Sequence, residues 1–279
     1  MSTSIRMAVL PLLGFTGSAV AQGTLDAGQT LRLEFPELPP TMHAMWDPSA
    51  GTAAVTVRFP DDYTREGSFP LLVHLEGGHG GNGGNLSIPL QVTQGKGYVV
   101  ANFPLFKRLQ PDPDLSWTIA IGADDASKIG QAYRTILAGL NAEIPNLDAT
   151  RSILGGHSNG AHTIAALLSV LDETTLASFS GFYFVDGGLD WSSFKRTEVL
   201  GGHSLLFLVG GGDGGDTDDW WRDHLKARTA FLQESARRTE MSHWRFEIID
   251  GVGHEFAREY FPKLRDWAAG VSRTAKKSQ

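Results

Sequence analysis

The sequence contains the segment GGHS twice, at residues 155–158 and 201–204, and each copy ends in a serine whose hydroxyl could act as a nucleophile. A serine hydroxyl attacks a carbonyl carbon when a base removes its proton and a third group orients that base. The first copy continues as GGHSNG, follows the β-rich run RSILGG and precedes the small-residue segment AHTIAALLSVL. The second copy precedes its β-rich run.

The first copy forms the pattern G-x-S-x-G around Ser158. A strand-to-helix turn of this kind strains the serine backbone and exposes its hydroxyl, and the glycines avoid clashes with the neighbouring strand and helix. The helix N-terminus also favours the negative charge that develops in acyl transfer. In the second copy, Leu206 occupies the place of the second glycine. We therefore predict Ser158 as the nucleophile and Ser204 as the first residue of a buried strand.

The predicted base is His254, which lies in the segment GHEF after the β-rich run HWRFEIID. A glycine-rich loop at the carboxyl end of a parallel strand can bring this imidazole to the nucleophile. We expect His157 and His162 to be packing or rim residues, because the turn should point them elsewhere, and His74 to lie in the core. No pair of histidines has zinc-ligand spacing with a matching acid, so the sequence predicts neither a metal site nor a cofactor.

The predicted orienting acid is Asp213, because the apolar run LLFLV leads into GGGD and the glycines let this loop turn towards His254. Asp216, three residues further on, is an alternative. Asp186 is a second alternative, because it also follows a β-rich run, GFYFV.

The developing oxyanion requires backbone N–H donors. We expect one from Asn159, directly after the nucleophile. The other is expected from the glycine-rich loop EGGHGG that follows PLLVHL, with Gly78 as the first choice and His79 as the alternative.

The elements that must position these residues alternate along the chain. Helical spacing of apolar residues predicts a helix over residues 124–140, with two aspartates at its start, and a last helix over residues 256–267. Strand–helix alternation favours an α/β fold with a mostly parallel sheet and helices on both faces. The β-rich runs are LRLEF, AAVTVRF, PLLVHL, GYVVANF, RSILGG, GFYFVDGG, SLLFLVGG and HWRFEIIDG.

The composition is that of a globular protein, with 279 residues, 41% hydrophobic residues, no cysteine and a formal net charge of −7. This charge is a poor match for nucleic acid or an anionic membrane. Residues 1–21 have one arginine, an apolar stretch and a terminal AVA, which predict a signal peptide and export to the periplasm or the medium. The sequence predicts no membrane span, one catalytic domain over residues 22–279 and no lipid-modified cysteine, and it leaves the oligomeric state open.

Over residues 53–270 the chain resembles the α/β-hydrolase superfamily, through the oxyanion loop EGGHGG, the turn GHSNG, the acid loop GGGD and the histidine segment GHEF, in the order serine, acid, histidine. Within it, PLLVHL with its glycine loop and the helix that begins with two aspartates are similar to secreted polyhydroxybutyrate depolymerases and to feruloyl and acetylxylan esterases. Glu76 stands where such families usually have a histidine, which leaves the choice between Gly78 and His79 open.

The resemblance implies a secreted serine esterase without a cofactor. Only about a dozen residues, Trp191 to Gly202, separate two of the predicted strands, so no large lid is expected. An open cleft favours bulky or polymer-linked esters, either a polyester or acyl groups on a plant or algal polysaccharide. A serine peptidase of the same fold and a non-catalytic binding protein of the same fold are the alternatives.

Overall fold

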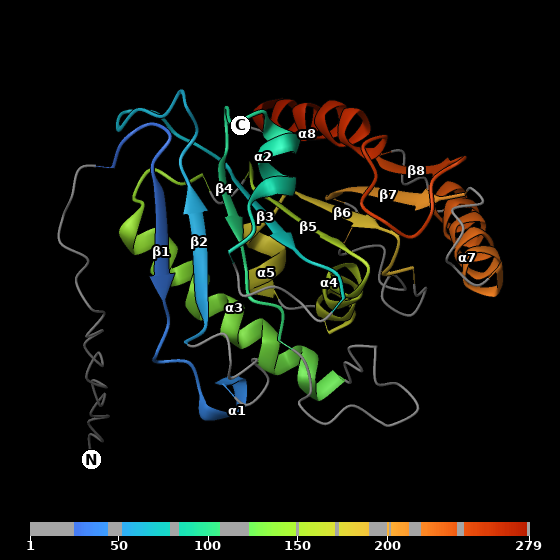
Figure 1. The fold of residues 1–279 in the computed structure, drawn as a ribbon, viewed down its shortest axis with the longest axis horizontal. Coiled ribbons are helices and arrows are strands. Elements are labelled where there is room, and N and C mark those ends of the chain that lie inside the picture. The colour runs from blue at the N-terminus through green and yellow to red at the C-terminus, as the bar shows by residue number, and fades with distance from the viewer. Residues whose placement is uncertain are drawn as a thin grey trace, which may run out of the picture.

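The computed structural model describes residues 25–43, 52–78, 84–106, 123–148, 151–170, 173–189, 200, 202–211, 219–238 and 243–277. Their centre is one twisted sheet of eight strands with helices on both faces (Figure 1). The predicted α/β fold with a mostly parallel sheet is therefore confirmed.

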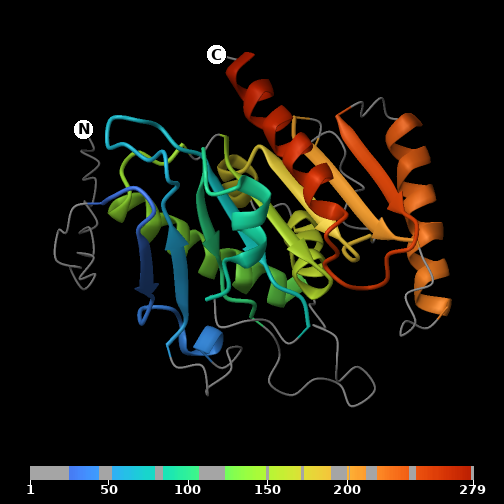
Figure 2. The same cartoon turned by 45° about the horizontal axis from the view of Figure 1, so that its top comes forward.

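The strands are arranged across the sheet in the order β1-β2-β4-β3-β5-β6-β7-β8 (Figure 2). The pairs β1–β2 and β2–β4 are antiparallel, and every pair from β4 to β8 is parallel. All eight β-rich runs of the sequence form strands. Their bounds are β1 Thr30–Glu34, β2 Ala54–Arg58, β3 Leu71–Leu75, β4 Val99–Asn102, β5 Ile153–His157, β6 Gly181–Val185, β7 Ser204–Gly210 and β8 Trp244–Ile249.

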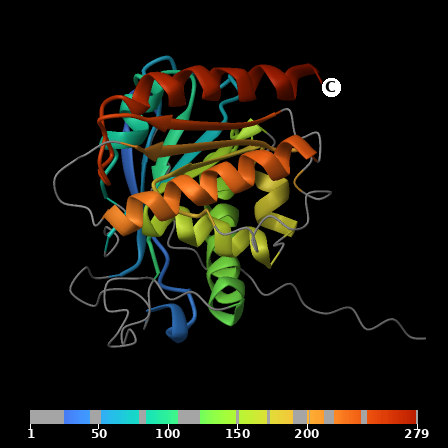
Figure 3. The same ribbon diagram turned by 90° about the vertical axis from the view of Figure 1, so that its right-hand side faces the viewer.

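Two layers of helices cover the sheet, and Figure 3 shows them on opposite sides of the strands. One apolar cluster joins the sheet to α3 (Ala123–Glu143), α4 (Asn159–Ser169), α5 (Glu173–Ser178) and α7 (Asp219–Arg238). The other joins the opposite face to α2 (Ser87–Thr93) and α8 (Tyr260–Lys277). The short helix α1 (Pro40–His43) contacts α3.

The apolar pattern of each strand matches its place in the sheet. β3 and β6 are buried along their whole length, as strands covered on both faces must be. β7 is buried from its second residue onward. β8 lies at the edge of the sheet and is mostly half-buried, as the alternation in HWRFEII predicts.

The last helix begins later than predicted. The apolar spacing predicts a start near Phe256, but α8 begins at Tyr260. Pro262 explains the difference, because proline lacks the N–H of a helix interior and is tolerated in a first turn. Phe256 consequently remains in the loop that carries His254.

Four predictions concern residues that lie wholly or partly outside the described ranges: the signal peptide over residues 1–21, the acid loop at Asp213 and Asp216, the alternative oxyanion donor His79, and the short connection from Trp191 to Gly202. Among the helices that the structure describes, none is both long and apolar enough to span a bilayer.

Candidate active site

The residues predicted for chemistry follow the carboxyl ends of neighbouring parallel strands, where loops meet at one edge of the sheet. Gly78 follows β3, Ser158 follows β5 and His254 lies in the loop after β8. The strand order places β3, β5, β6 and β7 side by side. The topology therefore brings segments from three distant parts of the sequence to one place.

Ser158 has a strained backbone, with φ of 49° and ψ of −114°. Residues other than glycine rarely adopt a positive φ, and such backbone strain persists only where the surrounding structure imposes it. Here the Ser158 N–H donates to the carbonyl of Val185 at 2.8 Å, and the His162 N–H donates to the carbonyl of Ser158 at 3.0 Å. Strand β6 and the first turn of α4 thus hold Ser158 between them.

The strained turn directs the hydroxyl of Ser158 to the predicted base. Ser158 Oγ lies 3.0 Å from His254 Nε2, which is hydrogen-bond distance. Burial lowers the pKa of His254 below its ordinary value of 6.5, because an apolar environment disfavours the imidazolium. A neutral imidazole at this distance can accept the serine proton.

The two GGHS copies differ in how closely their glycines pack. A Cβ on Gly156 would meet the carbonyl carbon of Gly160 at 2.5 Å, and a Cβ on Gly160 would meet the carbonyl oxygen of Leu75 at 2.3 Å. A Cβ on Gly202 has nothing within 4 Å. The glycines of the first copy are thus required by close packing, whereas Gly202 in the second belongs to an open turn.

Gly156→Ala should destabilise the fold by about 1–3 kcal/mol, the usual cost of overpacking, because the new methyl group displaces the start of α4. Thermal unfolding followed by circular dichroism measures this effect. Gly202→Ala is the matched control and should leave the melting temperature nearly unchanged. Equal losses in the two variants would mean that the turn at Gly156 is not packed as described.

The glycine loop after β3 lies against this turn. A Cβ on Gly77 would come within 2.8 Å of His157 Nδ1 and 3.2 Å of the Ser158 Cβ, so a larger residue there would require the turn to shift. Gly78 has a φ of 62°, and its carbonyl accepts a hydrogen bond from the Asn159 side-chain amide at 2.7 Å. The structure therefore brings Gly78 and Asn159 together beside Ser158, while His79 lies outside the described residues.

Of the three candidate acids, Asp186 alone lies within the described residues, and Asp213 and Asp216 do not. Asp186 follows β6, is 1% exposed and has a positive φ of 49°. A carboxylate oxygen of Asp186 lies within 4.8 Å of a ring nitrogen of His254.

The Asp186 carboxylate links two segments of the site. Its Oδ1 accepts the N–H of Gly210, the last residue of β7, at 2.7 Å, and its Oδ2 accepts the hydroxyl of Tyr260, the first residue of α8, at 2.9 Å. Burial raises the pKa of Asp186 to about 7, although both hydrogen bonds oppose this shift. Asp186 thereby fixes the strand that leads towards Asp213 and the helix that follows the His254 loop.

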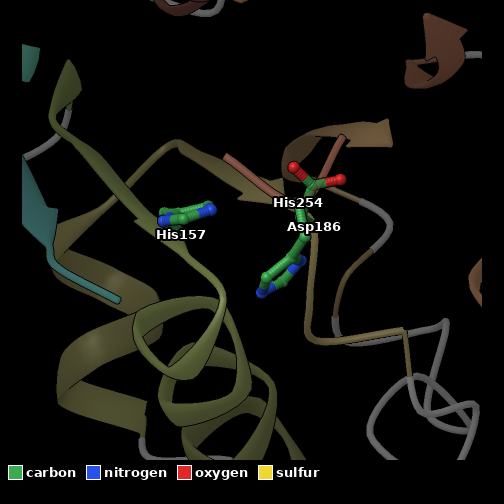
Figure 4. A group of neighbouring side chains, drawn as sticks. All are labelled: His157, Asp186 and His254. Carbon is green, nitrogen blue, oxygen red and sulfur yellow. The ribbon is translucent and has the colours of Figure 1, made fainter. Parts of the chain in front are cut away.

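His157 is a packing residue, one of its two predicted alternatives, but the sequence does not reveal that it packs beside His254 and Phe256. The ring centroid of His157 lies 5.4 Å from that of His254, and both His157 and His74 form T-shaped ring contacts with Phe256. Figure 4 shows His157, Asp186 and His254 gathered at this end of the sheet. Burial, followed by the nearby charge of His254, lowers the pKa of His157 to about 4, so His157 is neutral at pH 7.

Two further histidines near the site, His74 and His162, make contacts that hold structural elements together. His74 is fully buried on β3, as predicted, and its Nδ1 lies 2.7 Å from the hydroxyl of Tyr183. Burial lowers the pKa of His74 to about 3. His162 accepts the N–H of Gly188 at 3.3 Å, which ties α4 to the loop after β6.

Comparison with known proteins finds similarity in structure alone. No family model matches the sequence, and no curated protein matches it. An esterase of Rhizomucor miehei has a TM-score of 0.56 at 13% identity, covering 91% of this chain and 87% of that one. A feruloyl esterase module from Clostridium thermocellum has a TM-score of 0.54 at 10% sequence identity, and the match covers 87% of each chain. An acetyl xylan esterase from Paenibacillus sp. R4 has a TM-score of 0.50 at 13% sequence identity, and the match covers 78% of this chain and 79% of that one.

Identities this low establish the fold and leave the activity to the site itself. The sequence resembles the α/β-hydrolase superfamily, and the fold agrees with that resemblance. The sheet has eight strands, is mostly parallel and carries helices on both faces, and the structural neighbours agree with the same resemblance. The chain has the α/β-hydrolase fold.

Proposed function

We propose that this protein is a serine esterase that hydrolyses carboxylic esters. The observation that carries the proposal is the 3.0 Å contact between Ser158 Oγ and His254 Nε2, made by a serine whose backbone is strained into a sharp strand-to-helix turn. A serine that only packed would need neither the strain nor a neutral imidazole at its hydroxyl. The esterases among the structural neighbours support the same reaction class.

In the proposed reaction, His254 removes the proton of Ser158 as Oγ attacks the ester carbonyl carbon. The carbonyl oxygen becomes an oxyanion, for which we assign the backbone N–H groups of Asn159 and Gly78 as donors. The intermediate collapses with loss of the alcohol, which takes the proton from His254. Water, activated by the same histidine, then attacks the acyl-enzyme and releases the acid.

We assign the orienting acid to Asp213 rather than to Asp186. An orienting acid must be ionised to stabilise the imidazolium, yet burial raises the pKa of Asp186 to about 7. Both Asp186 oxygens also accept hydrogen bonds, from Gly210 and Tyr260. These contacts suit a residue that anchors the end of β7, three residues before Asp213.

For the substrate we propose bulky or polymer-linked esters, processed outside the cytoplasm. Two neighbours are esterases whose names refer to feruloyl esters and to acetylated xylan. The short connection predicted from Trp191 to Gly202 leaves little chain for a lid, and the signal peptide predicted over residues 1–21 agrees with export of a catalytic domain over residues 22–279.

A substrate panel tests the function. Chromogenic acyl esters, feruloyl esters, acetylated xylan and a polyester film should include at least one ester that is hydrolysed with turnover. A chromogenic peptide amide is the matched comparison. Turnover of the amide together with inert esters would replace the esterase assignment with a peptidase.

The pH dependence of kcat/KM should report His254. Burial lowers the pKa of His254 from its ordinary value of 6.5, whereas the ionised Asp213 carboxylate that we assign to it would raise that pKa. Because only the neutral imidazole can accept the serine proton, kcat/KM should fall towards acid pH along a limb that involves one proton. Initial rates with a neutral chromogenic ester measure it. A limb that requires two protons, or a rate that does not change through the pH range of an imidazole, would contradict a single histidine base.

A further inference from the structure

The proposed base and two neighbouring side chains form a group that no step of the proposed reaction uses as a set. His157 ends β5, Asp186 follows β6 and His254 lies after β8. Each offers one ligand atom, and these atoms all lie within 4.8 Å of one another (Figure 4). Two imidazoles and one carboxylate are the donors that zinc and related transition metals take in proteins.

The surroundings of this group suit a cation. The Asp186 carboxylate is buried, and its two described hydrogen bonds come from neutral donors, the Gly210 N–H and the Tyr260 hydroxyl. Burial disfavours the ionised form of this carboxyl group, and a bound divalent ion would stabilise that form. Among the residues that the structure describes, the buried Nε2 of His157 has no hydrogen-bond partner.

We propose that His157, Asp186 and His254 form an inhibitory site for a divalent transition metal such as Zn²⁺. Zinc bonds of about 2.0–2.1 Å in a tetrahedron separate ligand atoms by about 3.3 Å, so the group must contract by about 1.5 Å at most. Hydrogen bonds from two elements hold Asp186, so the two histidines make this movement. Water takes the fourth position.

Metal binding stops the base whichever nitrogen of His254 coordinates. At Nε2 the metal occupies the lone pair that accepts the Ser158 proton. At Nδ1 its positive charge lowers the basicity of Nε2. The inhibition rests on the proposed function, whereas the binding does not.

The donor set also determines which metals bind. Imidazole favours Zn²⁺, Cu²⁺ and Ni²⁺, whereas Ca²⁺ and Mg²⁺ prefer more oxygen ligands than this group offers. Zinc and copper should therefore inhibit ester hydrolysis, and calcium and magnesium should not.

Binding is tested on the full chain carrying Ser158→Ala, so that the result does not depend on activity. Calorimetric titration with ZnCl₂ should give one equivalent, and Co²⁺ should give the visible absorption of a tetrahedral site. Adding His157→Gln or Asp186→Asn should weaken binding at least about tenfold, since each removes a ligand. His243→Gln, at the amino end of β8, is the matched control and should leave binding unchanged, and circular dichroism verifies the fold of each variant.

Inhibition is tested on the wild-type chain and on the His157→Gln and Asp186→Asn variants that keep Ser158. Saturating ZnCl₂ should lower kcat/KM at least about tenfold, because the base is lost, and EDTA should restore it. Each variant is compared with its own metal-free rate, so a change in basal activity cancels. Absent binding, binding that survives both His157→Gln and Asp186→Asn, or binding without inhibition of an active esterase would each overturn the proposal. One bound zinc in a chain without esterase activity would support the site and remove the proposed function instead.

Discussion

Replacing Ser158 with alanine should lower kcat/KM for ester hydrolysis by about four to six orders of magnitude, the scale of losing a catalytic serine. The reaction loses its nucleophile, and the oxyanion donors alone sustain only a small residual rate. The fold should remain intact, because the hydrogen bond to His254 is the described contact of the Ser158 hydroxyl. Alanine at position 158 must adopt the same positive φ as the serine that it replaces, so the backbone strain does not change. Steady-state kinetics and thermal unfolding measure the two effects separately.

Ser204→Ala is the matched control, since it removes the serine of the other GGHS copy. Ser204 begins β7, where its N–H donates to the carbonyl of Ser180 at 3.1 Å, a bond that alanine keeps. The activity of this variant should match the wild type. A dead Ser204→Ala variant, or a Ser158→Ala variant within tenfold of the wild type, would reject the nucleophile assignment.

Asp213→Asn should have the second-largest effect and lower kcat by about ten-thousand-fold, as loss of an orienting carboxylate does in serine proteases. The amide no longer stabilises the imidazolium and favours the wrong tautomer of His254. Steady-state kinetics at saturating ester measure it.

Asp186→Asn and Asp216→Asn are the comparisons for this assignment. Asparagine at 186 can still accept the Gly210 N–H through its amide oxygen, so the end of β7 keeps its anchor. We expect smaller losses in both variants than in Asp213→Asn. Full loss in Asp186→Asn alone would move the orienting acid to the end of β6, and full loss in Asp216→Asn alone would move it three residues along the loop.

The fold follows from local patterns that the sequence displays directly. β3 and β6 read as short apolar runs, because helices cover both of their faces. Ser158 is recognisable because the glycines around it have a steric purpose, which the packing of Gly156 and Gly160 bears out. His254 is recognisable because its glycine-rich loop follows a strand. Each of these features depends on residues close together in the sequence.

The remaining features depend on contacts between distant segments. Asp186 reaches Gly210 and Tyr260, which lie 24 and 74 residues away. The contact of His157 with His254 requires the turn after β5 and the loop after β8 to meet, so the sequence predicts only a packing or rim residue. The group of His157, Asp186 and His254 likewise has no spacing in the sequence that a zinc motif would display.

We propose Ser158 as the nucleophile and His254 as its base. Incubation with a fluorophosphonate, followed by peptide mass mapping, tests this assignment without knowledge of the natural ester, because this reagent modifies serines activated by a base. The result we predict is one adduct per chain, on Ser158 within GGHSNG, and its near-complete loss in the His254→Ala variant. An adduct on another residue, or labelling of Ser158 that is equally fast without His254, would contradict the account.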